Sequence, residues 1–291
     1  MQINGEIIVG IDGSRACREA AAWALKEAGH HGVGVRLVSV VAPSAPGSAP
    51  TDEARAAAQQ ALDSVSAQLS ELLPDARFET VLETGDPAEV LAALSEHAGL
   101  VVIGQHGSDQ RTGGRIGTIS SGLPGHALCP VLIYRDTEAS EFDSADAHVT
   151  GGGGVVVGQD TSDYAGVAAL DAAAYAARTG AELTIVVVTT PLRDDARVRA
   201  QTELDMAWLR SQVPGLSVRT EFVEGDPVDV LTECSAGADL LVMGKRGLGR
   251  FSSMRVQLGR TSSQVLDAAQ CSLLLVPFRD DPALEHRRSA D

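Results

Sequence analysis

Two patterns of apolar residues alternate along the chain. Short runs rich in Val, Ile and Leu lie between turn residues, and in the first half they occupy 7–11, 33–41, 77–83, 100–104 and 131–134. Between them lie Ala-rich segments whose apolar residues recur at helical spacing, at 17–30, 52–73 and 86–99. Runs that are apolar on both sides are typical of buried parallel strands. The pattern therefore predicts a parallel sheet covered by helices on both faces.

Turn and cap residues fix the ends of these helices. The second helix should stop before Pro74, and the third should begin with Asp86 as its N-cap and Pro87 at its first position. A last helix should begin at Gly117-Thr118, but it is followed by ISSGLPGHALCP. A proline inside a helix costs about 3 kcal/mol. We therefore expect this last helix to be short or broken after its first turn.

Four segments of the first half return in the second half, in the same order. IIVGIDGS at 7–14 matches VVVGQDTS at 155–162, ETGDPAEVL at 83–91 matches VEGDPVDVL at 223–231, LVVIGQHG at 100–107 matches LLVMGKRG at 240–247, and ALCPVLIY at 127–134 matches AQCSLLLV at 269–276. The starting positions differ by 148, 140, 140 and 142 residues. Such similar offsets indicate a duplicated domain. The predicted fold is α/β, with two tandem doubly wound domains that each contain a five-stranded parallel sheet.

The stretch between the two copies has the composition of a linker. It reads RDTEASEFDSADAHVTGGGG, which is polar, acidic and ends in four glycines. We divide the chain into a first domain at 1–136, a linker at 137–152, a second domain at 153–279 and a flexible tail at 280–291.

Composition narrows the classes of partner. The 291 residues carry a net charge of −16 and only 3% aromatic side chains, so nucleic acid and anionic membranes are unexpected partners. The cysteines form no CxxC pair and the histidines form no metal-binding cluster, so neither a disulfide framework nor a metal site is predicted. The sequence shows no signal peptide and no apolar run of membrane-spanning length, which favours the cytoplasm.

A glycine-rich stretch, GQHGSDQRTGGRIGT at 104–118, follows the fourth predicted strand. In open α/β sheets, ligands bind beyond the carboxyl ends of the strands, where the winding reverses. There the turn at Asp12 should face the loop that starts at Gly104. Unpaired N–H groups at the start of the helix after Gly117 suit a phosphate, and Thr118 or Ser120 could add a hydroxyl. Asp12 suits the amine or hydroxyls of a nucleoside.

Taken together, the motifs resemble the universal stress protein family in its tandem form. They are a strand ending in GIDGS, a GDP turn before a helix, a G-x₂-G-x₉-G-[ST] loop and a closing CPVLIY strand. The resemblance implies ATP binding, with or without Mg²⁺, and a role in the response to stress or dormancy. It also implies that the two copies pair through VLIY and LLLVPF, and it leaves a homodimer of whole chains open.

The resemblance also implies which residues contact the nucleotide. In the first copy these are Gly10, Asp12, Gly104, Gln105, His106, Gly107, Ser108, Gly117 and Thr118. In the second copy the matching residues are Gly158, Asp160, Gly244, Lys245, Arg246, Gly247 and Gly259.

The second copy departs from the family pattern. Eleven residues separate Gly247 from Gly259 where the family has nine, Arg260 replaces the Ser/Thr, and Thr161 replaces the glycine found at Gly13. The longer loop either bulges outward and leaves the site intact or fills the pocket. Arginine can itself bind phosphate.

Several residues have a simpler structural interpretation. Asp12 could serve only as an N-cap, and this is the favoured interpretation of Asp86 and Asp226. His106 could contact phosphate, but a lone surface histidine is the more common case. The cysteines at the start of the last strands and the two tryptophans are interpreted as core residues, namely Cys129, Cys271, Trp23 and Trp208.

Three functions remain open at this stage. The first is a nucleotide-binding stress regulator that is not an enzyme. The second is a slow ATPase or phosphoryl-transfer enzyme, which is disfavoured because no GxxxxGK[ST] loop and no obvious water-activating base are found. The third is an interaction protein that binds no nucleotide. Neither the stress signal nor the protein partner is indicated by the sequence.

Overall fold

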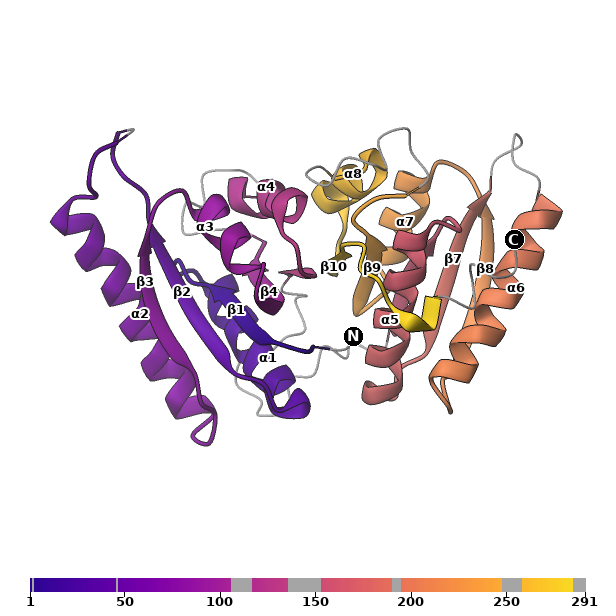
Figure 1. Cartoon of the computed structure of the whole chain (residues 1–291), viewed down its shortest axis with the longest axis horizontal. Helices are drawn as coiled ribbons and strands as arrows, with labels where there is room; N and C mark the ends of the chain where they lie inside the picture. The colour runs from indigo at the N-terminus through magenta and orange to yellow at the C-terminus, as the bar shows by residue number, and fades with distance from the viewer. Residues whose placement is uncertain are drawn as a thin grey trace. The chain divides into compact units, whose positions relative to one another are not determined.

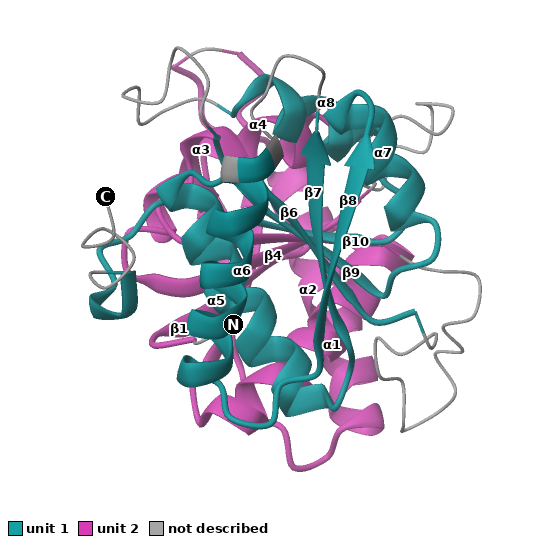
Figure 2. Ribbon diagram, turned by 90° about the vertical axis from the view of Figure 1, so that its right-hand side faces the viewer, with its two compact units in different colours: residues 1–2, 149–291 teal, residues 3–148 magenta. Residues whose placement is uncertain are grey.

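A computed structural model describes residues 1, 3–45, 47–105, 117–135, 153–189, 195–247 and 258–284. The chain divides into two compact units, one of residues 3–148 and one of residues 1–2 and 149–291, coloured separately in Figure 2. We call them the N-terminal unit and the C-terminal unit. Each contains one copy of the sequence repeat, as the duplication predicts.

The N-terminal unit is a doubly wound α/β domain with the strand order β3-β2-β1-β4-β5 (Figure 1). All neighbouring strands in it are parallel. Its strands are β1 (Glu6–Gly10), β2 (Val35–Val41), β3 (Glu79–Thr84), β4 (Ala98–Gly104) and β5 (Val131–Tyr134). Its helices are α1 (Arg15–His31), α2 (Asp52–Leu72), α3 (Pro87–Leu94) and α4 (Thr118–His126).

The C-terminal unit repeats this architecture, with the strand order β10-β9-β6-β7-β8 and parallel neighbours. Its strands are β6 (Val155–Gln159), β7 (Leu183–Thr189), β8 (Val218–Glu224), β9 (Leu240–Gly244) and β10 (Ser272–Val276). Its helices are α5 (Asp163–Thr179), α6 (Asp195–Gln212), α7 (Pro227–Ser235) and α8 (Arg260–Ala268). The predicted fold class is confirmed for both units.

Helices cover both faces of each sheet. In the N-terminal unit α1 packs beside α2 on one face, and α3 packs beside α4 on the other; in the C-terminal unit α5 with α6 and α7 with α8 do the same (Figure 1). Right-handed crossovers between parallel strands require this arrangement when the winding reverses after the third strand. The inner strands are almost wholly buried, and their Val, Ile and Leu side chains form the core, whereas the edge strands β3 and β8 are half-buried to exposed.

The two predicted caps of the GDP turns are confirmed. Asp86 Oδ1 accepts the N–H groups of Ala88 and Glu89, and Asp226 Oδ1 accepts that of Val228. Each carboxylate thus satisfies N–H groups at the start of a helix that begins with proline.

Of the two predicted alternatives for the helix after Gly117, a short helix is observed and a break after the first turn is not. Helix α4 runs for nine residues, with Pro124 inside it. Proline at this point removes only its own hydrogen bond, and the helix continues for just two further residues, so little is left to disrupt. Leu123 and Pro124 are both buried, and this apolar burial offsets the loss of one hydrogen bond.

The predicted flexible tail at 280–291 begins with an ordered segment. Residues 282–284 form the 3-10 helix η2 (Pro282–Leu284), Leu284 is buried, and the Trp208 indole N–H donates to the Ala283 carbonyl at 2.8 Å. Trp208 is half-buried under this segment, whereas Trp23 is buried in the N-terminal unit. The segment is ordered because it supplies both an apolar side chain and a hydrogen-bond acceptor to the helices.

The cysteines at the start of the last strands behave as core residues, as predicted. Cys129 and Cys271 are buried, and burial raises the pKa of the Cys129 thiol to about 12. Burial also raises the pKa of Cys17 to about 11, with a further contribution from the nearby charge of Asp12. At neutral pH these thiols are protonated and therefore poor nucleophiles.

Candidate functional site

The winding reverses where the sequence analysis placed it. In the N-terminal unit β1 lies beside β4, so the loops that follow these two strands start next to each other. The same holds for the loops after β6 and β9 in the C-terminal unit. A Cβ atom on Gly104 would lie only 2.8 Å from the Cβ of Ala16 in α1. The loop after β4 therefore begins directly against the first turn of α1, and a side chain at position 104 would separate them.

The carboxylate of Asp12 shapes the first loop. Its Oδ1 accepts the N–H of Ser14 at 2.9 Å, and Gly13 between them has a φ of 81°, in the left-handed region that favours glycine. The N-cap of α1 is Ser14, whose hydroxyl accepts the N–H of Cys17 at 3.2 Å. The interpretation of Asp12 as the helix cap is therefore wrong, because it lies two residues before the capping position.

Main-chain hydrogen bonds close the glycine-rich loop of the N-terminal unit. The N–H of Gln105 donates to Tyr134 at the end of β5, at 2.9 Å, and the N–H of Gly117 donates to the Gln105 carbonyl, at 3.1 Å. The Ser120 hydroxyl donates to the Gly104 carbonyl at 2.9 Å. These bonds hold the start of α4 against the end of β4. They also use the Ser120 hydroxyl, so Thr118, which is exposed, remains as the hydroxyl candidate.

The C-terminal unit has the same set of bonds. Lys245 N–H donates to the Val276 carbonyl at 2.7 Å, and Gly259 N–H donates to the Lys245 carbonyl at 2.9 Å. The Ser262 hydroxyl donates to Gly244 at 2.9 Å. The longer loop of this copy is therefore closed at its ends exactly where the shorter loop is closed. Residues 248–257, on which the choice between an outward bulge and a filled pocket depends, lie outside the described residues.

Helices α4 and α8 begin without a side-chain cap. Gly117 and Gly259 occupy the N-cap positions, and among the residues that the structure describes no side chain accepts a first-turn N–H as a cap of either helix. Five other helices have a capping side chain, namely Ser14, Thr51, Asp86, Ser162 and Asp226. An uncapped helix start presents unpaired N–H groups and a partial positive charge, both of which suit an anion.

In the C-terminal unit the two loops meet. Asp160 Oδ1 accepts the N–H of Ser162 at 3.0 Å, as Asp12 does for Ser14. A Cβ atom on Gly247 would lie 2.0 Å from Asp160 Oδ2. The acid of the loop after β6 thus lies against the glycine loop after β9, and only glycine leaves room for it. This confirms, for this unit, the expectation that the two loops face each other.

Two of the predicted ligand contacts are explained by packing. A Cβ atom on Gly10 would lie 2.9 Å from Cγ2 of Ile103, and one on Gly158 would lie 3.2 Å from both Cδ atoms of Leu231. These glycines make room for core side chains next to the strand. The structure therefore accounts for Gly10 and Gly158 without a ligand.

Thr161 has a strained backbone. Its φ is 69°, and it is the non-glycine residue with a positive φ in the part of the chain that the structure describes. A β-branched residue is an outlier in this region. We expect Thr161→Gly to raise the free energy of unfolding by about 1 kcal/mol, because glycine adopts this conformation without strain. Urea unfolding measures the change; Gly13→Thr should produce a loss of similar size, and equal stability of both variants and wild type would contradict the interpretation.

The first two residues after β9 differ in charge from their counterparts. Lys245 and Arg246 are 4% and 6% exposed, whereas Gln105 is half-buried in the other unit. Burial, together with the charge of Arg246, lowers the pKa of Lys245 to about 8. Two buried cations therefore follow each other in the glycine loop of the C-terminal unit.

The lowered pKa predicts a pH dependence of stability. Below about pH 8 Lys245 is charged in the folded and unfolded states, and the folded protein bears the full penalty of burying the charge. Between that pKa and the ordinary value of 10.5, the unfolded state binds more protons, so the free energy of unfolding should rise with pH. Thermal unfolding at pH about 7.5 and about 10 should show this rise, and Lys245→Gln should reduce it. An unchanged pH dependence in the variant would contradict the assignment.

The remaining predicted contacts divide into two groups. Asp12, Gly104, Gln105, Gly117 and Thr118 lie at neighbouring strand and helix ends, as their counterparts do in the other unit. His106, Gly107 and Ser108 lie outside the described residues. Among the described residues, no group of three or more His, Cys, Asp or Glu side chains is placed to hold a metal ion.

Tyr164 is a residue of this region that the sequence analysis missed. A Cβ atom on Gly244 would lie 2.9 Å from the Cβ of Tyr164, in the first turn of α5. The corresponding residue in the first copy is Ala16, which lies against Gly104. Aligning the two copies shows this change from alanine to tyrosine, and the change could have drawn attention to Tyr164.

Comparisons of the sequence with a family model and with known proteins point to the same family. The sequence pattern of the universal stress protein family matches residues 4–135 and again residues 154–277. A universal stress protein of Mycobacterium tuberculosis is 29% identical over 92% of this chain and 96% of its own. Another from that organism is 26% identical over 97% and 98%.

Solved structures agree in fold. A universal stress protein from Archaeoglobus fulgidus superimposes with a TM-score of 0.71 at 20% identity, covering 95% of this chain and 97% of its own. In the described part of the chain, no helix has both the length and the apolar character that crossing a membrane requires.

Proposed function

The chain belongs to the universal stress protein family, of which it carries two domains in tandem, and from this premise we propose that each unit binds one molecule of ATP. The bound nucleotide would regulate the protein in a response to stress or dormancy. The proposal adds a ligand and a role to the family membership.

One observation carries the proposal: among the seven helices whose N-caps the structure describes, the two that begin beside the glycine loops, α4 and α8, start without a side-chain cap. The triphosphate would accept hydrogen bonds from the N–H groups of their first turns. Because the chain has a net charge of −16, long-range attraction cannot hold a polyanion, and the local N–H groups and helix dipole must do so.

The other end of the nucleotide would lie beside the acid of the first loop. Asp12 and Asp160 would accept hydrogen bonds from the ribose hydroxyls or the adenine amine, because a carboxylate is an acceptor and repels phosphate. Because Ala16, Tyr164 and Asp160 already fill the space beside Gly104, Gly244 and Gly247, the glycines at the helix starts, Gly117 and Gly259, would let the phosphates approach the main chain. The donors around this site fit phosphate groups, and Mg²⁺, if bound with ATP, would neutralise part of the triphosphate charge.

We infer that the protein holds ATP as a ligand rather than turning it over. The chain lacks a GxxxxGK[ST] loop, and slow hydrolysis is the most that we expect. We place the protein in the cytoplasm and expect protein partners that distinguish its nucleotide-bound form. The pairing of the two copies through their last strands stays a prediction.

The test begins with the intact chain purified without added nucleotide. Denaturing it and analysing the released small molecules by mass spectrometry should reveal ATP or its hydrolysis products. Titration calorimetry of the nucleotide-free protein should then give two ATP molecules per chain and no steady release of phosphate. A stoichiometry of zero would refute the proposal, one would restrict it to a single unit, and steady turnover would favour the enzyme.

A further inference from the structure

After β10, the chain turns back over the helices of the C-terminal unit. Residues 277–284, which we call the closing segment, follow β10 directly and end in η2. They are attached through three contacts: a ring contact of Phe278, an ion pair of Arg279, and the hydrogen bond from Trp208 to Ala283. The closing segment is thus fixed to both α5 and α6.

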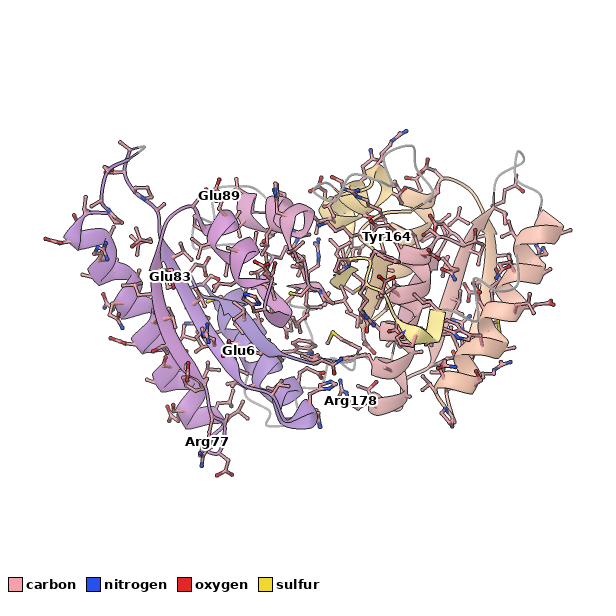
Figure 3. All side chains as sticks on the ribbon, in the orientation of Figure 1. Glu6, Arg77, Glu83, Glu89, Tyr164 and Arg178 are labelled. Atoms are coloured by element: carbon pink, nitrogen blue, oxygen red, sulfur yellow. The ribbon has the colours of Figure 1, made fainter. Side chains whose placement is uncertain are left out.

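The first contact leads to the glycine loop. The ring centroids of Phe278 and Tyr164 are 5.7 Å apart and the ring planes are inclined by 53°, a favourable tilted geometry. Tyr164, labelled in Figure 3, stands in the first turn of α5, where its main chain and Cβ lie directly against Gly244. A displacement of Tyr164 would therefore shift Gly244, at the start of the glycine loop.

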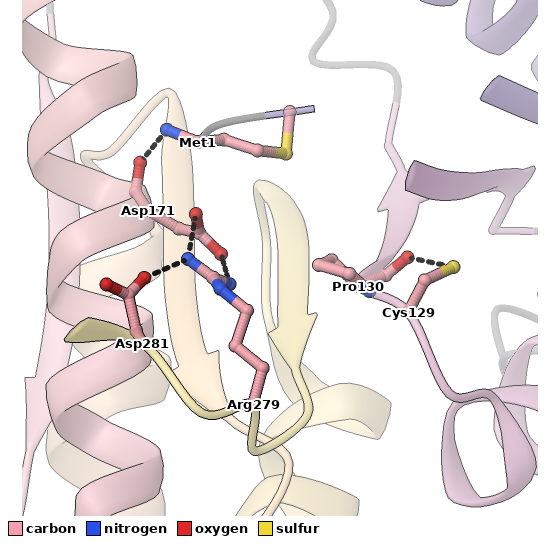
Figure 4. A network of polar contacts seen from close by, with 6 residues as sticks. All are labelled: Met1, Cys129, Pro130, Asp171, Arg279 and Asp281. Carbon is pink, nitrogen blue, oxygen red and sulfur yellow. Dashed lines mark hydrogen bonds and ion pairs between the residues drawn. The ribbon is translucent and has the colours of Figure 1, made fainter. Parts of the chain in front are cut away.

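The second contact is the ion pair between Arg279 and the buried carboxylate of Asp171. Arg279 donates to both carboxylate oxygens of Asp171, at 2.8 and 3.0 Å, and lies 3.6 Å from Asp281 (Figure 4). Asp171 is 1% exposed. Burial acts to lower the pKa of Arg279, but its hydrogen bond to Asp171 and the charges of both acids raise it overall. The Arg279 guanidinium therefore stays charged, and its two hydrogen bonds to Asp171 anchor the closing segment to the middle of α5.

The N-terminal unit lacks both anchors on its corresponding helix. With the offset of 148 residues between the copies, Tyr164 corresponds to Ala16 and Asp171 corresponds to Trp23. Alanine offers no ring, and Trp23 is buried with no charge. The attachment of the closing segment is thus specific to the second copy.

We infer that the closing segment, through Phe278 and Tyr164, positions residues 244–247 at the start of the glycine loop of the C-terminal unit, and that it thereby strengthens ATP binding to this unit. The inference rests on the proposed function. Coupling is reciprocal, so bound ATP should in turn hold the closing segment more firmly on α5 and α6. Phe278 is a positioning residue here, because it acts on the site through Tyr164.

The experiment uses a full-length chain that keeps one tryptophan as a fluorescent reporter and in which only the C-terminal unit can bind ATP. Trp23→Phe leaves Trp208 as the reporter, since the chain has two tryptophans, and its indole N–H bonds to the closing segment. Gly117→Asp places a carboxylate where the phosphate would bind in the N-terminal unit, so titration with ATP reports on the C-terminal unit. We expect ATP to change Trp208 emission and to slow amide hydrogen exchange in residues 281–284.

Variants of Phe278 test whether this residue positions the ATP site or only stabilises the fold. This side chain is 36% exposed, so Phe278→Ala should fold. We expect it to weaken ATP binding to the C-terminal unit roughly fivefold, at the lower end of common coupling factors. Phe278→Tyr, which retains the ring, should restore the affinity. In a Gly259→Asp chain, where only the N-terminal unit is open, Phe278→Ala should leave the affinity unchanged.

The outcomes distinguish this inference from the proposed function. ATP binding of equal strength in Phe278→Ala and its parent would overturn the positioning role and leave ATP binding intact. Weakening that Phe278→Tyr fails to restore, or that also occurs in the N-terminal unit, would overturn it as well. No binding to the Gly117→Asp parent would overturn both statements for the C-terminal unit.

Discussion

Replacing Gly117 with aspartate is expected to weaken ATP binding to the N-terminal unit by at least about a hundredfold, since two charges about 4 Å apart repel by about 4 kcal/mol near a protein surface. Gly117 is the N-cap of α4 and has φ −65° and ψ 157°, which aspartate adopts readily. Its carboxylate would accept the first-turn N–H groups and oppose the triphosphate. Titration calorimetry should show one of two binding events lost.

Two controls accompany this variant. Gly117→Asn competes for the same N–H groups without a charge and should weaken binding less. Gly259→Asp should remove the other binding event, because α8 begins in the same way. Since an acid at an N-cap stabilises a helix by about 1 kcal/mol, neither aspartate variant should melt earlier than wild type. Undiminished binding in both would exclude the helix starts as the phosphate sites.

The second large effect concerns the ion pair between Arg279 and Asp171. Arg279→Leu should lower the free energy of unfolding of the C-terminal unit by about 3 kcal/mol, because it removes the guanidinium from a buried carboxylate. Asp171 is 1% exposed, so water cannot replace the two lost hydrogen bonds without local opening. Denaturant unfolding measures the change.

The double variant provides the decisive comparison. With leucine at both positions no charge is left buried, and most of the stability should return. Trp23, the counterpart of Asp171 in the first copy, shows that an apolar side chain can occupy this place on the helix. If the double variant were as unstable as Arg279→Leu, lost packing would be the cause instead of the uncompensated charge.

The fold was predictable because its signals repeat. Each inner strand contains a short apolar run, and the GDP turns carry their own cap and proline, so the helices after them begin where expected. Because the domain is duplicated, each sequence motif occurs twice. The order of helices and strands was therefore clear even where the pattern in one copy was weak. Surface ion pairs, such as that between Arg36 and Glu6, had no such periodic signal; of these two residues Figure 3 labels Glu6.

The errors came from judging residues by type rather than by place. Pro124 was expected to shorten the last helix or to break it after its first turn, but it stands so near the end of this short helix that no break results. Asp12 suggested a cap, but Ser14 lies at the capping position. The polar residues after 279 suggested a free tail, although Leu284 and the Ala283 carbonyl bind it to the helices.

The candidate site was predictable in outline only. Its place at the reversal of the winding follows from topology, and the N-cap position of Gly117 follows from the glycine spacing. That α4 and α8 lack a capping side chain could not be read from sequence, because hydroxyl-bearing residues follow both glycines and one of them turns to the preceding strand. Tertiary contacts decide which donor a serine satisfies.

In each glycine loop a main-chain hydrogen bond joins the two described ends, from Gly117 to Gln105 in one copy and from Gly259 to Lys245 in the other, and so closes a ring. The rings span 117 − 105 = 12 and 259 − 245 = 14 positions. Enlarging such a ring by two residues adds only about 0.1 kcal/mol of closure entropy. Insertions here are therefore almost neutral for folding, and natural selection can lengthen or rewrite one ring while the other keeps its original form.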